Sequence, residues 1–212
     1  MDDPFESIDF FADTTDETVK RLQNEAEKLV KDSKVIRRFL EKQHNKVSSF
    51  SELSSLPQKN EQIRIITQQS MNAYALLLYI VESTNIQECY LTTYNMDKNT
   101  IQGLRAMVDS GIIQQLTLVI SDSVNFRMPD RASELKKIAG NGISLIFCWN
   151  HTKIILAKSD KNYYVIEGSG NLSDNARIEQ YLIEDCEETY NFHKNWIDEI
   201  KTKDYKRISI HE

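Results

Sequence analysis

The chain has few of the residues that break or cross-link a fold. Its 212 residues include only 6 glycines, 3 prolines and 3 cysteines. Cys89, Cys148 and Cys186 are odd in number and widely spaced in apolar or strand-like surroundings, which predicts buried free thiols instead of a disulfide framework or a zinc site. No apolar run approaches the roughly 20 residues that a membrane span requires. We therefore expect no membrane span, no metal and no cofactor.

Positive charge is also scarce. The formal net charge is -6, which argues against a protein that coats nucleic acid through bulk electrostatics, although a local basic site is still allowed. The first 17 residues carry seven acidic side chains and no basic one, unlike a secretory signal, which is basic and then apolar. A cytoplasmic location is the simplest expectation.

Residues 1–60 differ in pattern from the rest of the chain. After an acidic tail, Thr14 and Glu17 form a capping-box pattern, and apolar residues then recur at spacings of three and four over residues 19–40, which predicts one long amphipathic helix. Lysines and arginines line its other side, so it is a candidate dimer arm, a surface for a partner protein or a helix packed on the body. The serine-rich residues 48–61 predict a linker.

Residues 61–212 are expected to form the main domain, in which strand and helix patterns alternate. Strands separated by helical patterns of about 10 to 15 residues favour a largely parallel sheet with helices on both faces. After Trp149 two strands joined by a polar turn predict a hairpin, followed by a further strand and an amphipathic helix. The expected strands cover residues 63–67, 88–96, 115–121, 143–149, 151–157, 162–167 and 177–184, and the expected helices cover residues 70–84, 98–111, 129–142 and 186–203.

A histidine and a lysine two residues apart stand at the head of the predicted hairpin. On a strand, His151 and Lys153 would point to the same face and converge on one ligand. A neutral imidazole beside an ammonium is a nucleophile beside an anion clamp, the pair that attack on a phosphodiester requires. The turn Gly168-Ser169-Gly170-Asn171 uses two of the six glycines. Its glycines let backbone N–H groups approach an anion, while Ser169 and Asn171 add donors.

Other candidate residues surround this group. Glu179 opens an expected strand and is suited to accept the second ring N–H of the histidine. The alternative is a solvated carboxylate or an ion pair with Arg177. Trp149 and Tyr94 end neighbouring strands and are candidates for the mouth of the pocket or for the core. Arg127 and Arg131 are candidates for guiding a polyanion toward the site, but we favour the alternative of a solvated helix start.

His151-Thr-Lys153 followed by Gly168-Ser169-Gly170-Asn171 resembles the signature of the phospholipase D superfamily, H-x-K, then an aspartate, then G-S-x-N. The resemblance extends over roughly residues 62–200. It implies an α/β fold, with a mixed sheet flanked by helices, that cleaves phosphodiesters through a transiently phosphorylated histidine. The implied roles are nucleophile for His151, phosphate ligands for Lys153, Ser169 and Asn171, and support of the histidine for Glu179.

The chain departs from the family pattern in two ways. The position of the family aspartate falls at Lys158, with Asp160 two residues further on, which an extended hairpin explains. The chain also has one motif where a complete site uses two, because His44, His193 and His211 lack the surrounding signature. A symmetric homodimer would supply the second motif, with one His151 as nucleophile and its mate as general acid.

The sequence therefore predicts a metal-independent phosphodiesterase, with nucleic acid favoured over lipid as the substrate. The alternative function is a catalytically silent module that keeps the phosphate pocket and recruits a partner through its N-terminal helix.

Overall fold

The computed structural model describes residues 55–67, 71–173, 178–202 and 209–211 of the chain. The acidic tail and the long helix predicted over residues 19–40 lie outside the described residues. The strands are β1 (Gln62–Ile66), β2 (Ile86–Thr93), β3 (Ile113–Ser121), β4 (Ile143–Cys148), β5 (Ile154–Lys158), β6 (Tyr163–Gly168), β7 (Gln180–Asp185) and β8 (Ser209–His211). The helices are α3 (Ala73–Ser83), α4 (Lys98–Asp109), α5 (Ser123–Arg127), α6 (Pro129–Ile138) and α7 (Glu187–Thr202).

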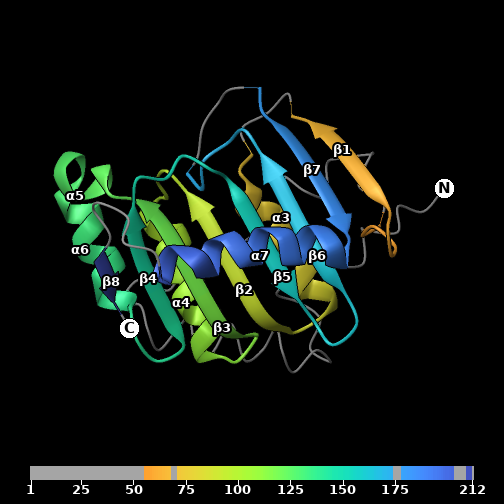
Figure 1. Cartoon of the computed structure of the whole chain (residues 1–212), viewed down its shortest axis with the longest axis horizontal. Helices are drawn as coiled ribbons and strands as arrows, with labels where there is room; N and C mark the ends of the chain where they lie inside the picture. The colour runs from red at the N-terminus through yellow and green to blue at the C-terminus, as the bar shows by residue number, and fades with distance from the viewer. Residues whose placement is uncertain (1–54, 68–70, 174–177, 203–208, 212) are drawn as a thin grey trace.

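All eight strands form one mixed sheet, in the order β1-β7-β6-β5-β2-β3-β4-β8 (Figure 1). β2, β3 and β4 run parallel to one another, as the intervening helices predict. Every other neighbouring pair is antiparallel, including the predicted β5–β6 hairpin. The mixed sheet that the resemblance implies is confirmed. The expectation of parallel strands before Trp149 was wrong for β1, which pairs antiparallel with β7 at the edge and not with β2.

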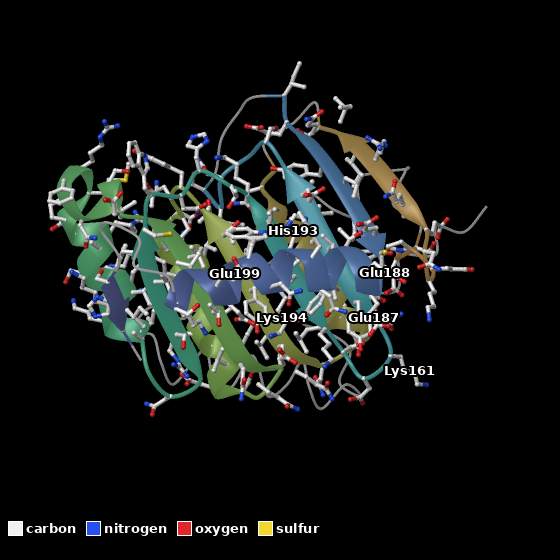
Figure 2. The ribbon with its side chains drawn as sticks, viewed as in Figure 1. Lys161, Glu187, Glu188, His193, Lys194 and Glu199 are labelled. Atoms are coloured by element: carbon white, nitrogen blue, oxygen red, sulfur yellow. The ribbon has the colours of Figure 1, made fainter. Side chains whose placement is uncertain are left out.

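Helices cover both faces of the sheet, and the strands alternate their apolar residues between the two. Along β5, Ile155 and Ala157 face the larger core beneath α3, α4 and α6, whereas Ile154 and Leu156 face α7. In Figure 1, α7 crosses in front of the sheet and α3 and α4 lie behind it. Figure 2 labels Glu187, Glu188, Lys194 and Glu199 along α7, whose buried side carries Tyr190 and Ile197.

Local signals account for most helix ends. Asn72 caps α3 by accepting from the Tyr74 N–H, and Asp97 caps α4 by accepting from the Thr100 N–H. Pro129 opens α6, as predicted. That helix stops at Ile138, earlier than expected, because Gly140, Asn141 and Gly142 all have positive φ angles.

The three cysteines are free thiols. Cys89 and Cys148 are buried, as predicted, and Cys186 is half-buried, because it precedes α7 at the rim of the sheet. Burial raises the pKa of Cys148 to about 11 and raises the pKa of Cys89 further.

Candidate functional site

The His-x-Lys segment precedes β5 instead of belonging to it. The strand begins at Ile154, one residue after Lys153, so the strand predicted from residue 151 starts too early. Asn150 anchors this lead-in segment. It is only 6% exposed, and its amide donates to the carbonyl oxygens of Thr93 and Val119, both at 3.2 Å. Its side-chain oxygen accepts from the Thr152 N–H at 3.0 Å and the Thr152 hydroxyl at 2.6 Å.

Thr152 points away from His151 and Lys153 and ties the segment to the end of β2. Its hydroxyl oxygen lies 2.8 Å from the Thr92 hydroxyl oxygen, and the Thr92 oxygen accepts from the Ile154 N–H at 3.1 Å. Buried hydrogen bonds of this kind fix a backbone because breaking them leaves polar atoms without water. Asn150 and Thr92 are the positioning residues that the sequence analysis missed, and the only signal for them is a polar residue at the end of an apolar strand.

The structure brings His151 and Lys153 together. The Lys153 ammonium lies 3.2 Å from Nδ1 of the imidazole and donates to the His151 carbonyl oxygen at 2.6 Å. The Tyr94 ring packs edge-on against the imidazole, with 5.6 Å between the ring centroids. Partial burial lowers the pKa of Lys153, and the negative charge of Glu179 opposes that shift. The side chains therefore form a histidine–ammonium pair, and the Glu179 carboxylate, which lies one residue before β7, acts on the charge of its lysine.

The Gly168–Asn171 turn lies directly beside this pair. The Gly168 N–H donates to the Lys153 carbonyl oxygen at 3.1 Å. Ser169 is bonded to the next strand through its backbone N–H, which donates to the Gln180 oxygen at 3.0 Å, and through its Oγ, which accepts from the Gln180 N–H at 3.0 Å. The turn is thus held between the His-x-Lys segment on one side and the start of β7 on the other.

Both glycines of the turn are required by packing against Tyr181. A Cβ at Gly170 would overlap the Tyr181 hydroxyl oxygen, and a Cβ at Gly168 would overlap its ring, with Cε1 at 2.6 Å and the Gln180 oxygen at 2.9 Å. The hydroxyl donates to the Met71 carbonyl oxygen at 3.2 Å, which holds the ring in place. Close approach of Tyr181 therefore accounts for two glycines in a glycine-poor chain, whereas the backbone approach to an anion stays a prediction.

Glu179 lies inward, one residue before β7. It is 9% exposed, and its carboxylate accepts a hydrogen bond from the Ser169 hydroxyl. Its backbone N–H donates to Thr67 Oγ1 at 3.0 Å, and its carbonyl oxygen accepts from the Thr67 N–H at 2.8 Å. The inward orientation agrees with the sequence pattern. The described carboxylate contact is with Ser169, so orientation of the imidazole by Glu179 stays a prediction.

Asn171 is held by the end of β2. Its side-chain oxygen lies 3.5 Å from Thr93 Oγ1, and that hydroxyl oxygen accepts from the Leu172 N–H at 3.2 Å. Thr93 also accepts from Asn150 through its carbonyl oxygen. One threonine therefore links the turn to the anchor of the His-x-Lys segment.

Asp160 does not belong to this group. It lies in the turn between β5 and β6, beside Lys161, which Figure 2 shows at the outer end of the hairpin, and it accepts from Gln87 Nε2 at 2.5 Å. Lys158 occupies the position of the family aspartate and pairs with Glu88 at 3.3 Å. The extended hairpin thus carries the aspartate away from His151, because the site lies at the opposite end of both strands.

A cleft of about 300 Å³ opens beside His151. Its lining includes Tyr94 and Trp149, both predicted at the mouth of the pocket, together with Arg127 and Asp122. Arg127 donates to the Tyr94 phenol oxygen at 3.3 Å. A hydrogen bond with Ser123 and the charge of Arg127 lower the pKa of Tyr94.

Two further properties concern the described part of the chain. Among these residues, no group of three or more His, Cys, Asp or Glu side chains is arranged to hold a metal ion. Of the helices described, none is both long and apolar enough to cross a membrane.

Comparison with solved structures finds similar folds. Polyphosphate kinase from Porphyromonas gingivalis matches with a TM-score of 0.54 and 15% identity, over 70% of this chain. This chain spans only 27% of that protein. Nuc from Salmonella typhimurium, a phospholipase D family member, matches with a TM-score of 0.50 and 20% identity, over 65% of this chain and 93% of its own. No protein-family model and no curated protein matches the sequence.

Proposed function

We propose that this chain, which has the phospholipase D-like fold, is a metal-independent phosphodiesterase that acts on nucleic acid. The observation that carries the proposal is the contact of 3.2 Å between Lys153 and His151, beside the Gly168–Asn171 turn. The names of the two similar proteins, a polyphosphate kinase and a phospholipase D family member, support an enzyme that acts on phosphate groups.

Binding of substrate begins with Lys153. In the structure its ammonium contacts Nδ1 of the ring and the carbonyl oxygen, both on His151. An anionic phosphate oxygen accepts a stronger, charge-assisted hydrogen bond and draws the ammonium away from the ring. Nδ1 is then free to carry the ring proton, which leaves Nε2 as the nucleophile. Ser169 and Asn171 hold the remaining phosphate oxygens.

The reaction proceeds in two displacements at phosphorus. His151 attacks, the N–P bond forms, the P–O bond to the leaving group breaks, and a general acid protonates the leaving oxygen. Water then attacks the phosphohistidine, the N–P bond breaks, and the water proton returns to the same group. Lys153 stabilises the charge that develops on the phosphoryl oxygens in both steps. Glu179 stabilises the cationic imidazole ring that forms when His151 becomes bonded to phosphorus.

The general acid is His151 of a second copy of the chain, because each chain carries one motif. A homodimer with a shared cleft places the two imidazoles on opposite sides of the phosphorus atom. We expect a mass in solution of twice the 24.6 kDa of one chain. A monomer at tens of micromolar would contradict the shared site.

The test is hydrolysis of bis-p-nitrophenyl phosphate and of single-stranded DNA in excess EDTA. We expect activity to persist, His151→Ala to abolish it, and Lys153→Ala to lower the rate about a hundredfold or more, as loss of a transition-state charge clamp does. His211→Gln is the matched control, since His211 lies on β8 at the far edge of the sheet. Activity that requires magnesium and survives His151→Ala would overturn the proposal.

One observation favours the second candidate, a silent module that binds phosphate without cleaving it. Lys158 occupies the position of the family aspartate and is paired with Glu88, while Asp160 lies at the far end of the hairpin. Phosphate binding that requires Lys153, without turnover of any diester, would select this candidate. Partner recruitment through the N-terminal helix stays a prediction, because that segment lies outside the described residues.

A further inference from the structure

Two large aromatic side chains stand exposed at the cleft beside His151. Trp149 is 84% exposed and Phe126 is 80% exposed, and both line the cleft that His151 also lines. Trp149 follows β4, and Phe126 is presented by the short helix α5. Tryptophan and phenylalanine are usually buried, because each removes a large apolar area from water. Two of them exposed at the rim of one cleft indicate a surface for a flat apolar ligand.

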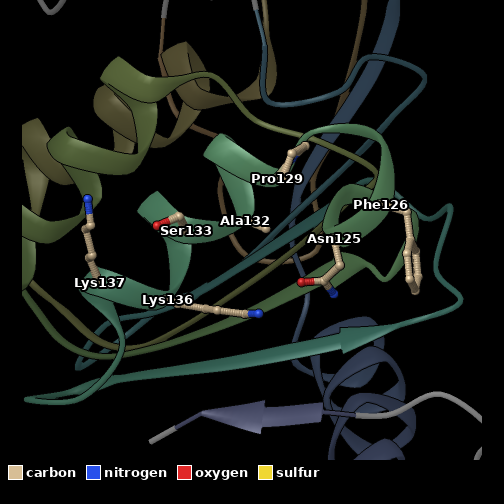
Figure 3. A pocket seen from close by; sticks show the side chains of 7 residues that line it. All are labelled: Asn125, Phe126, Pro129, Ala132, Ser133, Lys136 and Lys137. Atoms are coloured by element: carbon tan, nitrogen blue, oxygen red, sulfur yellow. The ribbon is translucent and has the colours of Figure 1, made fainter.

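A second hollow shares Phe126 with the cleft. This hollow, of about 660 Å³, lies between α5 and α6 and is lined by Asn125, Phe126, Pro129, Ser133, Lys136 and Lys137. Figure 3 shows Lys136 reaching from α6 toward α5, on which Asn125 and Phe126 lie. Phe126 lines both depressions, which therefore lie next to each other.

The charge along this path is positive although the chain as a whole is acidic. Arg127 lines the cleft, and Lys136 and Lys137 line the hollow. Asp122 is the one carboxylate among these lining residues, all of which the structure describes, and it is buried. Aromatic faces alternating with cations match a polymer that alternates flat bases with phosphates.

We propose that the path from His151 across Trp149 and Phe126 to Lys136 binds single-stranded nucleic acid. Unpaired bases stack on Trp149 and Phe126, and the flanking phosphates contact Arg127, Lys136 and Lys137. A duplex is excluded because its bases are already stacked on one another and expose only their edges. This inference rests on the proposed function, in that the bound strand presents its next phosphodiester to His151.

Binding is measured separately from cleavage in a His151→Ala/Trp196→Phe protein. The chain has two tryptophans, so Trp149 is then the only one left to fluoresce. Oligothymidylate, oligouridylate and a duplex of equal charge are titrated in turn. We expect quenching of Trp149 by at least one single strand and at least tenfold weaker binding of the duplex. The affinities for oligothymidylate and oligouridylate show whether the path prefers DNA or RNA.

Variants locate the strand on the path. In the His151→Ala protein we expect Trp149→Ala and Phe126→Ala each to weaken binding of a labelled single strand about tenfold or more, the loss typical of one stacked base. Phe192→Ala is the matched control, because Phe192 is a 68% exposed aromatic on α7 that lines neither depression. Lys136→Gln should lower the slope of log affinity against log salt by about 0.7, the value for one phosphate contact of a single strand.

The outcomes separate this inference from the proposed function. Selective binding that needs Trp149 and Phe126 supports the inference even when no diester is hydrolysed, and the proposed function alone then fails. Hydrolysis of bis-p-nitrophenyl phosphate without single-strand binding overturns the inference and leaves the proposed function. Equal affinity for the duplex, or full affinity in both alanine variants, also overturns it, and capture of a protein at this path would replace the strand with another occupant.

Discussion

The fit between Gly170 and Tyr181 makes a specific prediction about the Gly168–Asn171 turn. An alanine at position 170 adds a methyl group where the Tyr181 hydroxyl oxygen lies, and its other near neighbours are the Glu179 Cγ and Cδ atoms at 3.3 Å. The φ angle of Gly170 is not positive, so alanine meets no backbone strain there. Gly170→Ala should therefore destabilise the fold through steric overlap with Tyr181 and not through backbone strain.

The magnitude follows from the contacts. Overpacking in a tight site costs about 1–3 kcal/mol, and Tyr181→Phe loses a buried hydrogen bond to Met71 worth about 1 kcal/mol. The double variant Gly170→Ala/Tyr181→Phe removes the oxygen with which the methyl group collides. Its loss of stability should thus fall below the sum of the two single losses by about 1–2 kcal/mol, the size of coupling found between contacting residues.

Gly168→Ala supplies the matched control. Its added methyl group meets Cε1 of the Tyr181 ring and the Gln180 carbonyl oxygen, and both atoms remain in the phenylalanine variant. Urea unfolding of the three single variants and the two double variants, each compared with the parent, measures both coupling energies. We expect a clear coupling energy between position 170 and Tyr181→Phe, and little coupling energy between position 168 and Tyr181→Phe. Strict additivity at position 170 would refute the account of the turn as a site shaped by Tyr181.

Three further predictions concern the surroundings of the turn. Asn150→Ala should lower the free energy of unfolding by about 2–4 kcal/mol in urea titrations, because it strips partners from two buried carbonyl oxygens and from Thr152; a loss below 1 kcal/mol would show that the anchor is dispensable. Burial lowers the pKa of Lys153, so the affinity for sulfate, measured by calorimetry, should fall as rising pH removes the lysine proton, and the fall should start below the ordinary lysine range. The affinity of the Lys153→Arg variant should stay constant over the same pH range, because arginine keeps its proton. A thiol reagent at pH 8 should modify Cys186 quickly and should modify Cys89 and Cys148 slowly, because burial raises the pKa of both buried thiols. A fast phase of modification that survives Cys186→Ser would contradict this.

The sequence predicted the parts of the fold that depend on neighbours in the chain. The β5–β6 hairpin, the β2–β4 parallel unit and the first residues of α4 and α6 all follow from local turn and periodic signals. β1 was predicted as a strand, but its pairing with β7 was not, since no local signal records a partner so distant in the chain. α5 and β8 were missed because five and three residues are too few to show a period.

The candidate site was likewise predicted only where it depends on residues close together in the sequence. His151, Lys153 and the Gly168–Asn171 turn were found from spacing, and the structure places them side by side. The bond between Ser169 and Glu179 and the anchoring by Asn150 depend on contacts across the sheet, which the sequence does not record. The two glycines were noticed for the right reason, their rarity, but the side chain that requires them lies on another strand.

The pairing of β1 with β7 also sets the order in which the sheet can assemble. Thr67, at the end of β1, bonds to Glu179 across 112 positions of the chain, whereas the β5–β6 hairpin closes through a short turn. Closing a longer loop costs more chain entropy, and contacts distant in sequence slow folding. During synthesis β1 emerges early and waits unpaired until β7 has left the ribosome. The β5–β6 hairpin can therefore pair before β1 does, and Thr67 is fixed beside Glu179 only when the β1–β7 edge closes.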